Sequence, residues 1–511
     1  MFFRGANKFF KWILRSIFGV IKFFSSKYLL SVKLIKIKKK IFNYYQLMVM
    51  SEKKKKTGRI AAIYSFGNIA DITAYQSFIL LIFTFYYSVV GIQIELVTIG
   101  FIIWSFWNMI NDPLLGYFSD RTHTKYGRRR PWIMIAFIPL AIIMIFLFTP
   151  PLPLGIANQV GNFAYFMFII IIFELFYTMY SLNVTSMFPE VFLTVKERTQ
   201  GNNIRAVYTI IGLIVAFLLP GLIIRDFTDA AYLKQFQAFG VIACTVVAIT
   251  VIIFLMFGPK EMEEFRKDSE NALSLTKTIV YCLKSKSFRW YIIAELCNWF
   301  VYGMLPTIVP LYAKFVLGAE GFETSLLLGL TFISAALFMT VLWKPLVRKL
   351  GNKKSWIISM SIWAASLIPL MFIGNFIQGI VVFFLIGVGL SGSLYIIDLV
   401  VADIVDEDEV ATGLRREAGY YGVNALILRF SNVLVILAIG SVLSTVGWAV
   451  FEPTMVTPSV IFGLRSLMFI FPAIALIIAI LAMTQYPLHS DRLKNVKEKL
   501  KDIHEQKKAR I

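Results

Sequence analysis

Eight ionisable side chains lie within stretches that are otherwise apolar, and their chemistry needs explaining first. A charge inside an apolar span costs ~2.5 to 3.5 kcal/mol on insertion scales, so each needs a partner, a water-filled cavity or a function. Arg205, Arg465 and Asp398 have an alternative, because a side chain near a span end extends to the membrane interface. The eight residues are Asp71, Asp112, Glu174, Arg205, Glu295, Asp398, Arg429 and Arg465.

Asp112 is the most informative of these charges. Asn108 precedes it by four residues, so both lie on one helix face, and Pro113 frees a backbone carbonyl nearby. Such a face could bind a small cation. The alternative is a structural hydrogen-bonded seam between helices.

Cysteine and histidine supply little chemistry. The three cysteines show no paired spacing, which argues against a disulfide framework or a cysteine zinc site. The three histidines fall in polar connections or in the tail, which excludes a membrane-embedded histidine relay. A proton carrier inside the membrane must therefore be a carboxylate.

The composition requires a membrane around most of the chain. Of the 511 residues, 58% are hydrophobic and only 16% are charged, with a mean hydropathy of +0.73. Soluble chains carry about 25% charged residues, and apolar runs of about 20 residues span a bilayer. This excludes a soluble enzyme, and the lack of a GxxxxGK[ST] nucleotide loop disfavours an ATP-driven pump.

Twelve helical spans are predicted, in two groups of six. The polar stretch from Pro259 to Arg289 is the longest connection and separates the groups. The expected spans are 61–89, 94–119, 132–149, 162–188, 203–224, 238–258, 289–314, 323–345, 355–374, 376–401, 419–447 and 458–486.

Lysine and arginine crowd the connections after the second and eighth spans, whereas the alternate connections are nearly bare. The positive-inside rule therefore predicts that both termini are cytoplasmic and that the chain lies in the plasma membrane. Residues 125–132 (KYGRRRPW) also match residues 349–356 (KLGNKKSW) at a constant offset. Each copy joins the second and third spans of its group, as expected of two duplicated six-helix bundles.

The net charge of +21 lies mostly ahead of the first span, because residues 1–59 hold 16 Lys+Arg against one acid, Glu52. This basic leader suits an amphipathic helix on an anionic membrane surface, not a nucleic-acid partner. The alternative is a true start at Met48 or Met50. The predicted organisation is a leader (1–59), an N-terminal six-helix bundle (60–258), a cytoplasmic linker (259–288), a C-terminal bundle (289–487) and a charged cytoplasmic tail (488–511).

Two long motifs resemble the glycoside-pentoside-hexuronide:cation symporters, the melibiose permease group of the major facilitator superfamily. They are residues 107–132 (WNMINDPLLGYFSDRTHTKYGRRRPW) and 402–420 (ADIVDEDEVATGLRREAGY), with a weaker match at Glu197-Arg198 and Arg205. The resemblance covers residues 58–490 and implies an all-α membrane protein with the major facilitator fold. Its loop motifs imply gating or topology roles for Asp120, Arg121, Gly127, Arg130, Lys349, Gly351, Lys353, Asp403, Asp406 and Arg416.

The resemblance also implies a cation site, from which this chain departs. The family's second span-two acid corresponds to Asp112, whereas its first falls on Asn108 and its span-four acid on Ser181. Its basic residue on span eleven corresponds to Arg429, which stays protonated at physiological pH. We therefore expect Asp112 and Arg429 to be close and functionally coupled. Proton coupling, or facilitated transport without a coupling ion, is favoured over sodium coupling.

The expected function is secondary transport of a small solute, a sugar or glycoside, by alternating access of a monomer that needs no cofactor or metal. Alternatives are a lysolipid or organic-solute carrier, a facilitated uniporter and a non-transporting receptor. A substrate-facing aromatic of the family falls on Thr185, and its span-one acid lies one position from Asp71. The expected substrate-binding residues are Asp71, Tyr177, Thr185, Arg205, Asn298, Trp299, Asp398 and Asn424.

Overall fold

The computed structural model describes residues 57–509 apart from 123, 193, 260–274 and 414–416. Most of the predicted leader and half of the predicted linker therefore lie outside the described residues, as does Arg416. Residues 62–511 form one unit, and the packing below is that of this unit. Its described part is helical, and the only β-bridge there is an isolated one between Thr124 and Gly127.

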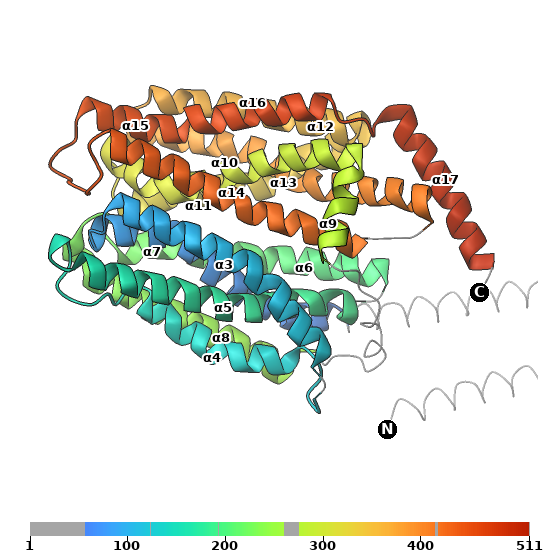
Figure 1. The fold of residues 1–511 in the computed structure, drawn as a ribbon, viewed down its shortest axis with the longest axis horizontal. Coiled ribbons are helices and arrows are strands. Elements are labelled where there is room, and N and C mark those ends of the chain that lie inside the picture. The colour runs from blue at the N-terminus through green and yellow to red at the C-terminus, as the bar shows by residue number, and fades with distance from the viewer. Residues whose placement is uncertain (1–56, 123, 193, 260–274, 414–416, 510–511) are drawn as a thin grey trace, which may run out of the picture. The chain divides into compact units, whose positions relative to one another are not determined.

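The N-terminal group of helices begins with the span Thr57–Val89, which ends in the π-helical turn η1 (Phe85–Val89). Figure 1 shows these helices in blue and green. They continue with α3 (Ile94–Arg121), α4 (Arg130–Phe146), α5 (Gln159–Val191), α6 (Val195–Leu213), η3 (Ile214–Leu218), α7 (Leu219–Ile223) and α8 (Leu233–Phe257), with η2 (Ile156–Asn158) and η4 (Ala230–Tyr232) in the connections.

The C-terminal group follows α9 (Leu275–Lys284), a short helix in the connection between the groups. These helices run from yellow to red in Figure 1. They are α10 (Lys286–Leu317), α11 (Gly321–Phe338), η6 (Met339–Trp343), α12 (Lys344–Leu367), η7 (Ile368–Met371), α13 (Phe376–Thr412), α14 (Glu417–Thr445), α15 (Pro458–Met468), α16 (Ile470–Thr484) and the tail helix α17 (Ser490–Ala509).

Ten helical segments of the described chain are long and apolar enough to cross a membrane. One of them, Gly321–Met371, has 51 residues, too many for one crossing of a bilayer about 30 Å thick. Gly351 divides it, because its φ of 75° and ψ of 171° are not helical. The apolar helix Arg130–Phe146 is shorter than the ten. Dividing the long segment and adding this helix is consistent with the twelve predicted spans.

Each group packs mainly within itself. In the first, α4 packs on α5 and α8; in the second, α12 packs on α13 and α10 on α16. The two groups, called the N-terminal and C-terminal halves below, meet where α3 packs on α14 and where α7 and η3 pack on α11. The halves therefore share two helix–helix seams.

Glycines allow the close approach at both seams. A Cβ on Gly440 of α14 would lie 2.3 Å from Thr98 Oγ1 of α3, and a Cβ on Gly221 of α7 would lie 2.3 Å from Ser325 Oγ of α11. Small residues let helix backbones approach closely in this way. Gly440 and Gly221 therefore permit the close helix packing at the two seams.

Polar contacts join the halves at the end opposite the basic loops 121–130 and 344–354. Lys314 Nζ lies 2.8 Å from Asp226 Oδ2, and the Gly321 amide donates to the Arg225 carbonyl at 2.7 Å. The Ile94 amide likewise donates to the Ala449 carbonyl at 2.9 Å. The structure is therefore closed at the end opposite the basic loops.

Candidate functional site

An ion pair joins the two halves deep within the helices. Arg429 of α14 donates from Nη2 and Nε to Oδ2 of Asp112 on α3, at 2.8 and 3.2 Å. Both side chains are about one-fifth exposed, at 23% and 22%. The closeness predicted for these two residues is therefore confirmed.

A second acid lies next to this pair. Glu174 of α5 is fully buried, and its Oε2 accepts a hydrogen bond from Trp104 Nε1 at 3.0 Å. The Thr178 hydroxyl lies 3.1 Å from both Glu174 Oε1 and Asp112 Oδ1. The sequence placed Glu174 in a span but assigned it no role, because nothing in its local pattern links it to Asp112.

The Thr178 hydroxyl limits the protonation of this cluster. A hydroxyl has one proton, so it donates to only one of the two carboxylates at a time. Both short contacts are satisfied together when one carboxyl group carries a proton and donates to the hydroxyl oxygen. Arg429 holds Asp112, so Glu174 is the acid that fits this protonated form.

Neither Asn108 nor Ser181 is hydrogen-bonded to Asp112 among the described residues. Asn108 is fully buried, and neither polar atom of its amide has a hydrogen-bond partner among the described residues. Ser181 instead belongs with Asp71, whose charge also interacts with Tyr177 and Arg205. The described residues hold no group of three or more His, Cys, Asp or Glu side chains that could bind a metal ion.

Aromatic rings adjoin the Asp71 cluster. Tyr177 stacks on Tyr75 with ring centroids 4.9 Å apart and planes 18° apart. The Arg205 guanidinium lies 4.8 Å from the centre of the Phe188 ring, a cation–π contact. Three predicted substrate residues, Asp71, Tyr177 and Arg205, therefore gather on the first span, α5 and α6.

Two further predicted substrate residues are exposed in the isolated chain. Thr185 lies on α5 one turn beyond Ser181 and two turns beyond Tyr177, so the three share a face. Asp398 of α13 is exposed, and its charge interacts with that of Arg205 across the two halves.

A second buried acid, Glu295, brings together predicted residues of the C-terminal half. Its Oε1 accepts hydrogen bonds from Asn424 Nδ2 at 2.8 Å and Trp299 Nε1 at 3.3 Å. Tyr291 in turn donates to Asn424 Oδ1 at 3.3 Å. Asn424 and Trp299 therefore donate hydrogen bonds to Glu295. From the sequence, Glu295 was expected in a span, but no role was assigned to it.

Asn298, another predicted substrate residue, is buried in the C-terminal half. It is 2% exposed, donates to the Ala294 carbonyl at 2.7 Å and contacts the sulfur of Met360 on α12. Helical spacing alone does not tell which face of α10 meets α12, so this contact could not be predicted from the sequence. Its role in substrate binding stays a prediction.

The basic loops cap helix ends. Arg130 donates to the Leu255 carbonyl at the end of α8. Lys353 donates to the Thr484 and Tyr486 carbonyls at and beyond the end of α16, both at 2.8 Å. A cation at a helix C-terminus stabilises the carbonyls left without intrahelical partners. Outside these loops, Arg465 binds the Met371 and Ile373 carbonyls in the same manner.

The N-terminal basic loop binds an acid of α5. Arg128 and Arg129 both bind Glu190 Oε1 of α5, at 2.7 and 3.1 Å, whereas the Asp120 side chain lies outside the described ones. Arg121 lies over the Tyr117 ring at 3.8 Å. Gly127 and Gly351 both have positive φ, 109° and 75°, which explains glycine in each copy of the loop.

The tail helix binds the motif at the end of α13. Lys497 Nζ lies 2.7 Å from Asp403 Oδ1 and 2.6 Å from Asp406 Oδ2. Asn352 of the second basic loop also donates to Asp403, at 2.6 Å. Burial lowers the pKa of Lys497, but its hydrogen bonds to the two aspartates outweigh burial and raise the pKa overall. Lys349 has no ion pair among the described residues.

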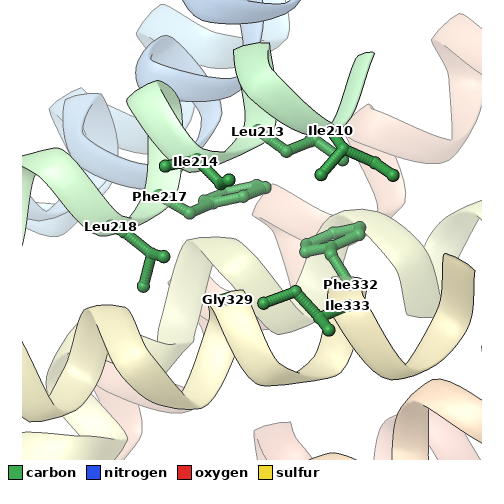
Figure 2. Close-up of a pocket in the computed structure, with 8 residues that line it drawn as sticks. All are labelled: Ile210, Leu213, Ile214, Phe217, Leu218, Gly329, Phe332 and Ile333. Carbon is green, nitrogen blue, oxygen red and sulfur yellow. The ribbon is translucent and has the colours of Figure 1, made fainter. Parts of the chain in front are cut away.

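An apolar crevice separates α6 and α11 at the side of the two halves. Figure 2 shows its lining side chains, with the Phe217 and Phe332 rings facing each other from opposite halves. These rings are stacked, with centroids 4.7 Å apart. The crevice is narrow, with a cavity volume of about 20 Å³, and contains none of the charged residues described above. Its lining is Ile210, Leu213, Ile214, Phe217, Leu218, Gly329, Phe332 and Ile333.

The model of the family described as "MFS/sugar transport protein" matches residues 63–490. The chain belongs to this family. It is therefore a multi-pass membrane protein and a secondary transporter of small solutes, and its resemblance to the glycoside-pentoside-hexuronide symporters is confirmed.

Individual relatives are distant. An uncharacterized symporter of Synechocystis is 24% identical over 89% of this chain and 99% of its own. A putative sulfoquinovose importer of Escherichia coli is 26% identical over 78% of this chain and 84% of its own. Among solved structures, a D-xylose–proton symporter aligns with a TM-score of 0.60 at 14% identity, over 83% of this chain and 96% of its own. The nucleoside transporter NupG aligns with the same TM-score and identity, over 84% and 99%. These structures establish the major facilitator fold.

Proposed function

We propose that this transporter of the MFS/sugar transport protein family carries a sugar or glycoside coupled to protons. The observation that carries the proposal is the contact of Asp112 with both Arg429 and Thr178, which places an ion pair between the halves next to the buried acid Glu174. A charge pair that spans the moving interface links protonation to the movement of the halves.

The composition of the cluster favours protons over sodium. Sodium requires several oxygen ligands, but Asp112 is already bound to a guanidinium, and Asn108 and Ser181 stand where the resemblance predicts carboxylates. The shared Thr178 hydroxyl, by contrast, makes good hydrogen bonds to both carboxyl groups when one of them carries a proton, which supports proton coupling. Facilitated transport without a coupling ion is the alternative outcome.

Sugar chemistry suits the residues around Asp71. The stacked pair Tyr75 and Tyr177 offers aromatic faces, and Asp71, Arg205 and Asp398 offer charged groups for hydroxyls. The relatives include a raffinose carrier of Pediococcus pentosaceus and an isoprimeverose transporter of Lactiplantibacillus pentosus. We extend sugar transport from them to this chain as part of the proposal.

An apolar solute is the second candidate. The crevice between α6 and α11 is lined only by apolar residues and opens between the halves, which favours a solute with an acyl chain. We also infer cytoplasmic termini, because the basic loops and leader match the positive-inside rule. A plasma-membrane location, action as a monomer and the lack of a nucleic-acid partner stay predictions from the sequence.

Two measurements test the proposal. Thermal-shift screening of the purified protein against lactose, raffinose, lysophosphatidylcholine and organic acids should show stabilisation by a saccharide. Uptake of that saccharide into proteoliposomes should rise with an inward proton gradient and not with a sodium gradient. Stabilisation by the lysolipid alone would favour the second candidate, and stimulation by sodium alone would overturn proton coupling.

A further inference from the structure

The two halves correspond residue by residue at one separation. The matching loops 125–132 and 349–356 are 224 residues apart. When 224 is added to the residue numbers of the N-terminal half, α4 corresponds to α12 and α6 corresponds to α14. In the same way, α8 corresponds to α15 and α16. The duplication therefore extends far beyond the loop in which it is visible by eye.

Six of the eight intramembrane charges form three pairs at this separation. In each pair the charge has the same sign, so the duplicated arrangement includes the charges themselves. The pairs are Asp71 with Glu295, Glu174 with Asp398, and Arg205 with Arg429.

Asp112 breaks this symmetry. Its counterpart in the C-terminal half is Ala336, so this acid exists once. In the N-terminal half, Arg205 interacts with the charge of Asp71. The counterpart of Arg205 is Arg429, but its guanidinium is bound to Asp112. Glu295 is the counterpart of Asp71. It therefore lacks the interaction with an arginine that Asp71 has with Arg205.

The surroundings of Glu295 contain only neutral donors and acids. It is 1% exposed, and its Oε1 accepts from Asn424 and Trp299. Its Oε2 is buried without a hydrogen-bond partner among the described residues. The titratable groups around it there are Tyr291 of α10, Asp398 of α13 and, beyond Tyr291, Tyr421 of α14. The packed helices α11, α15 and α16 contribute no titratable group to its interactions.

We propose that Glu295 is a second proton-carrying site, which holds its proton on Oε2 while Arg429 is bound to Asp112. A buried carboxylate without a cation nearby is far costlier than the neutral acid. The coupling role of this proton rests on the proposed function, whereas the presence of the proton does not.

The broken symmetry also suggests how the proton leaves. When the Asp112–Arg429 pair opens, Arg429 becomes available to Glu295 as Arg205 is to Asp71. The O–H bond of Glu295 then breaks, the carboxylate remains beside the guanidinium, and one proton passes to solvent. Opening of the ion pair between the halves would thereby release a proton from within one half.

Infrared difference spectroscopy tests the proton without a substrate. Spectra of the purified protein at alkaline minus neutral pH should contain a carbonyl stretching band of a protonated carboxyl group. Glu295→Gln should remove one such band, whereas Glu452→Gln, at an exposed loop position, should leave the spectrum unchanged. Glu295→Asp keeps an acid and should shift the band. If Glu295→Gln fails to fold, the band shift in Glu295→Asp assigns the band to Glu295. If the carboxyl region of the spectrum is unchanged in whichever of the two variants folds, the proposal is overturned.

Proteoliposome uptake tests coupling separately, with lactose as the probe. In Glu295→Gln, exchange of labelled lactose across a membrane without gradients should persist, while stimulation by a proton gradient should fall at least about fivefold. A variant that keeps the full stimulation would overturn the coupling role. Absence of lactose exchange in the unmodified protein would instead count against the proposed sugar substrate and leave the infrared result standing.

Discussion

Arg429 on α14 and Asp112 on α3 are 317 positions apart in the chain, yet two guanidinium nitrogens lie 2.8 and 3.2 Å from one oxygen of the carboxylate. The pair lies on the seam along which the two halves must move during transport. Both charges are only partly exposed, so solvent compensates neither fully. Each charge therefore depends on the other for its stability.

Removing either member of the pair should abolish most transport. Asp112→Asn leaves Arg429 uncompensated, and Arg429→Gln does the same to Asp112, so we expect uptake to fall at least about tenfold in each, equivalent to about 1.4 kcal/mol. Uptake of the identified saccharide into proteoliposomes is the measurement. Wild-type uptake in both single variants would remove the pair from the mechanism.

Glu174→Gln should separate proton coupling from solute movement. Glutamine resembles the protonated acid, so the contacts with Trp104 and Thr178 are retained while titration is lost. We expect exchange of labelled solute to stay within about twofold of wild type and stimulation by a proton gradient to decrease. Glu452→Gln, which alters an exposed acid outside the cluster, controls for a general loss of charge. Retained stimulation would show that Glu174 does not exchange protons during transport.

A larger residue at Gly440 should prevent closure at the end opposite the basic loops. Even a Cβ there meets Thr98 at 2.3 Å, whereas a Cβ on Gly422 of the same helix meets nothing within 4 Å. We expect Gly440→Val to reduce uptake at least about fivefold through overpacking, and Gly422→Val to have little effect. Uptake and thermal stability of both variants are the measurements. Equal uptake in the two variants would contradict closure along this seam.

Lys497→Gln should release the tail helix from α13. The ammonium group binds both Asp403 and Asp406, whereas Lys499, two positions further on, has no ion pair among the described residues. Hydrogen–deuterium exchange of residues 490–509 should become faster in Lys497→Gln and remain unchanged in Lys499→Gln. Equal protection in both variants would show that α17 is held by other contacts.

The same contact has a defined pH dependence. Because the folded state raises the pKa of Lys497, the stabilisation is fully present below the ordinary lysine pKa and is lost as pH rises through the folded pKa. Exchange of α17 should therefore respond to alkaline titration and not to changes near neutrality, apart from the intrinsic pH dependence of amide exchange. A release near neutral pH would assign the contact to another group.

The sequence by itself determined the kind of protein. Apolar runs interrupted by rare charges require membrane spans, and KYGRRRPW and KLGNKKSW identify two duplicated halves. The motif around Asp112 also predicted its proximity to Arg429. These inferences succeed because they depend on local features of the sequence. Such features are the hydrophobic periodicity, the glycine and proline residues that end helices, and the basic loops, which also recur in both halves.

Only the tertiary structure decided which charges meet. Glu174 joins Asp112 through Thr178 on α5, and Glu295 is bound by Asn424 on α14, both by contacts between separate helices. Asn298 contacts Met360 on α12, because packing sets the rotation of α10 about its axis. The spacing of residues in the sequence predicts which residues share one face of a helix. It does not predict which neighbouring helix that face will contact. The contacts of Glu174 and Glu295 therefore depend on helix packing, which local sequence spacing does not reveal.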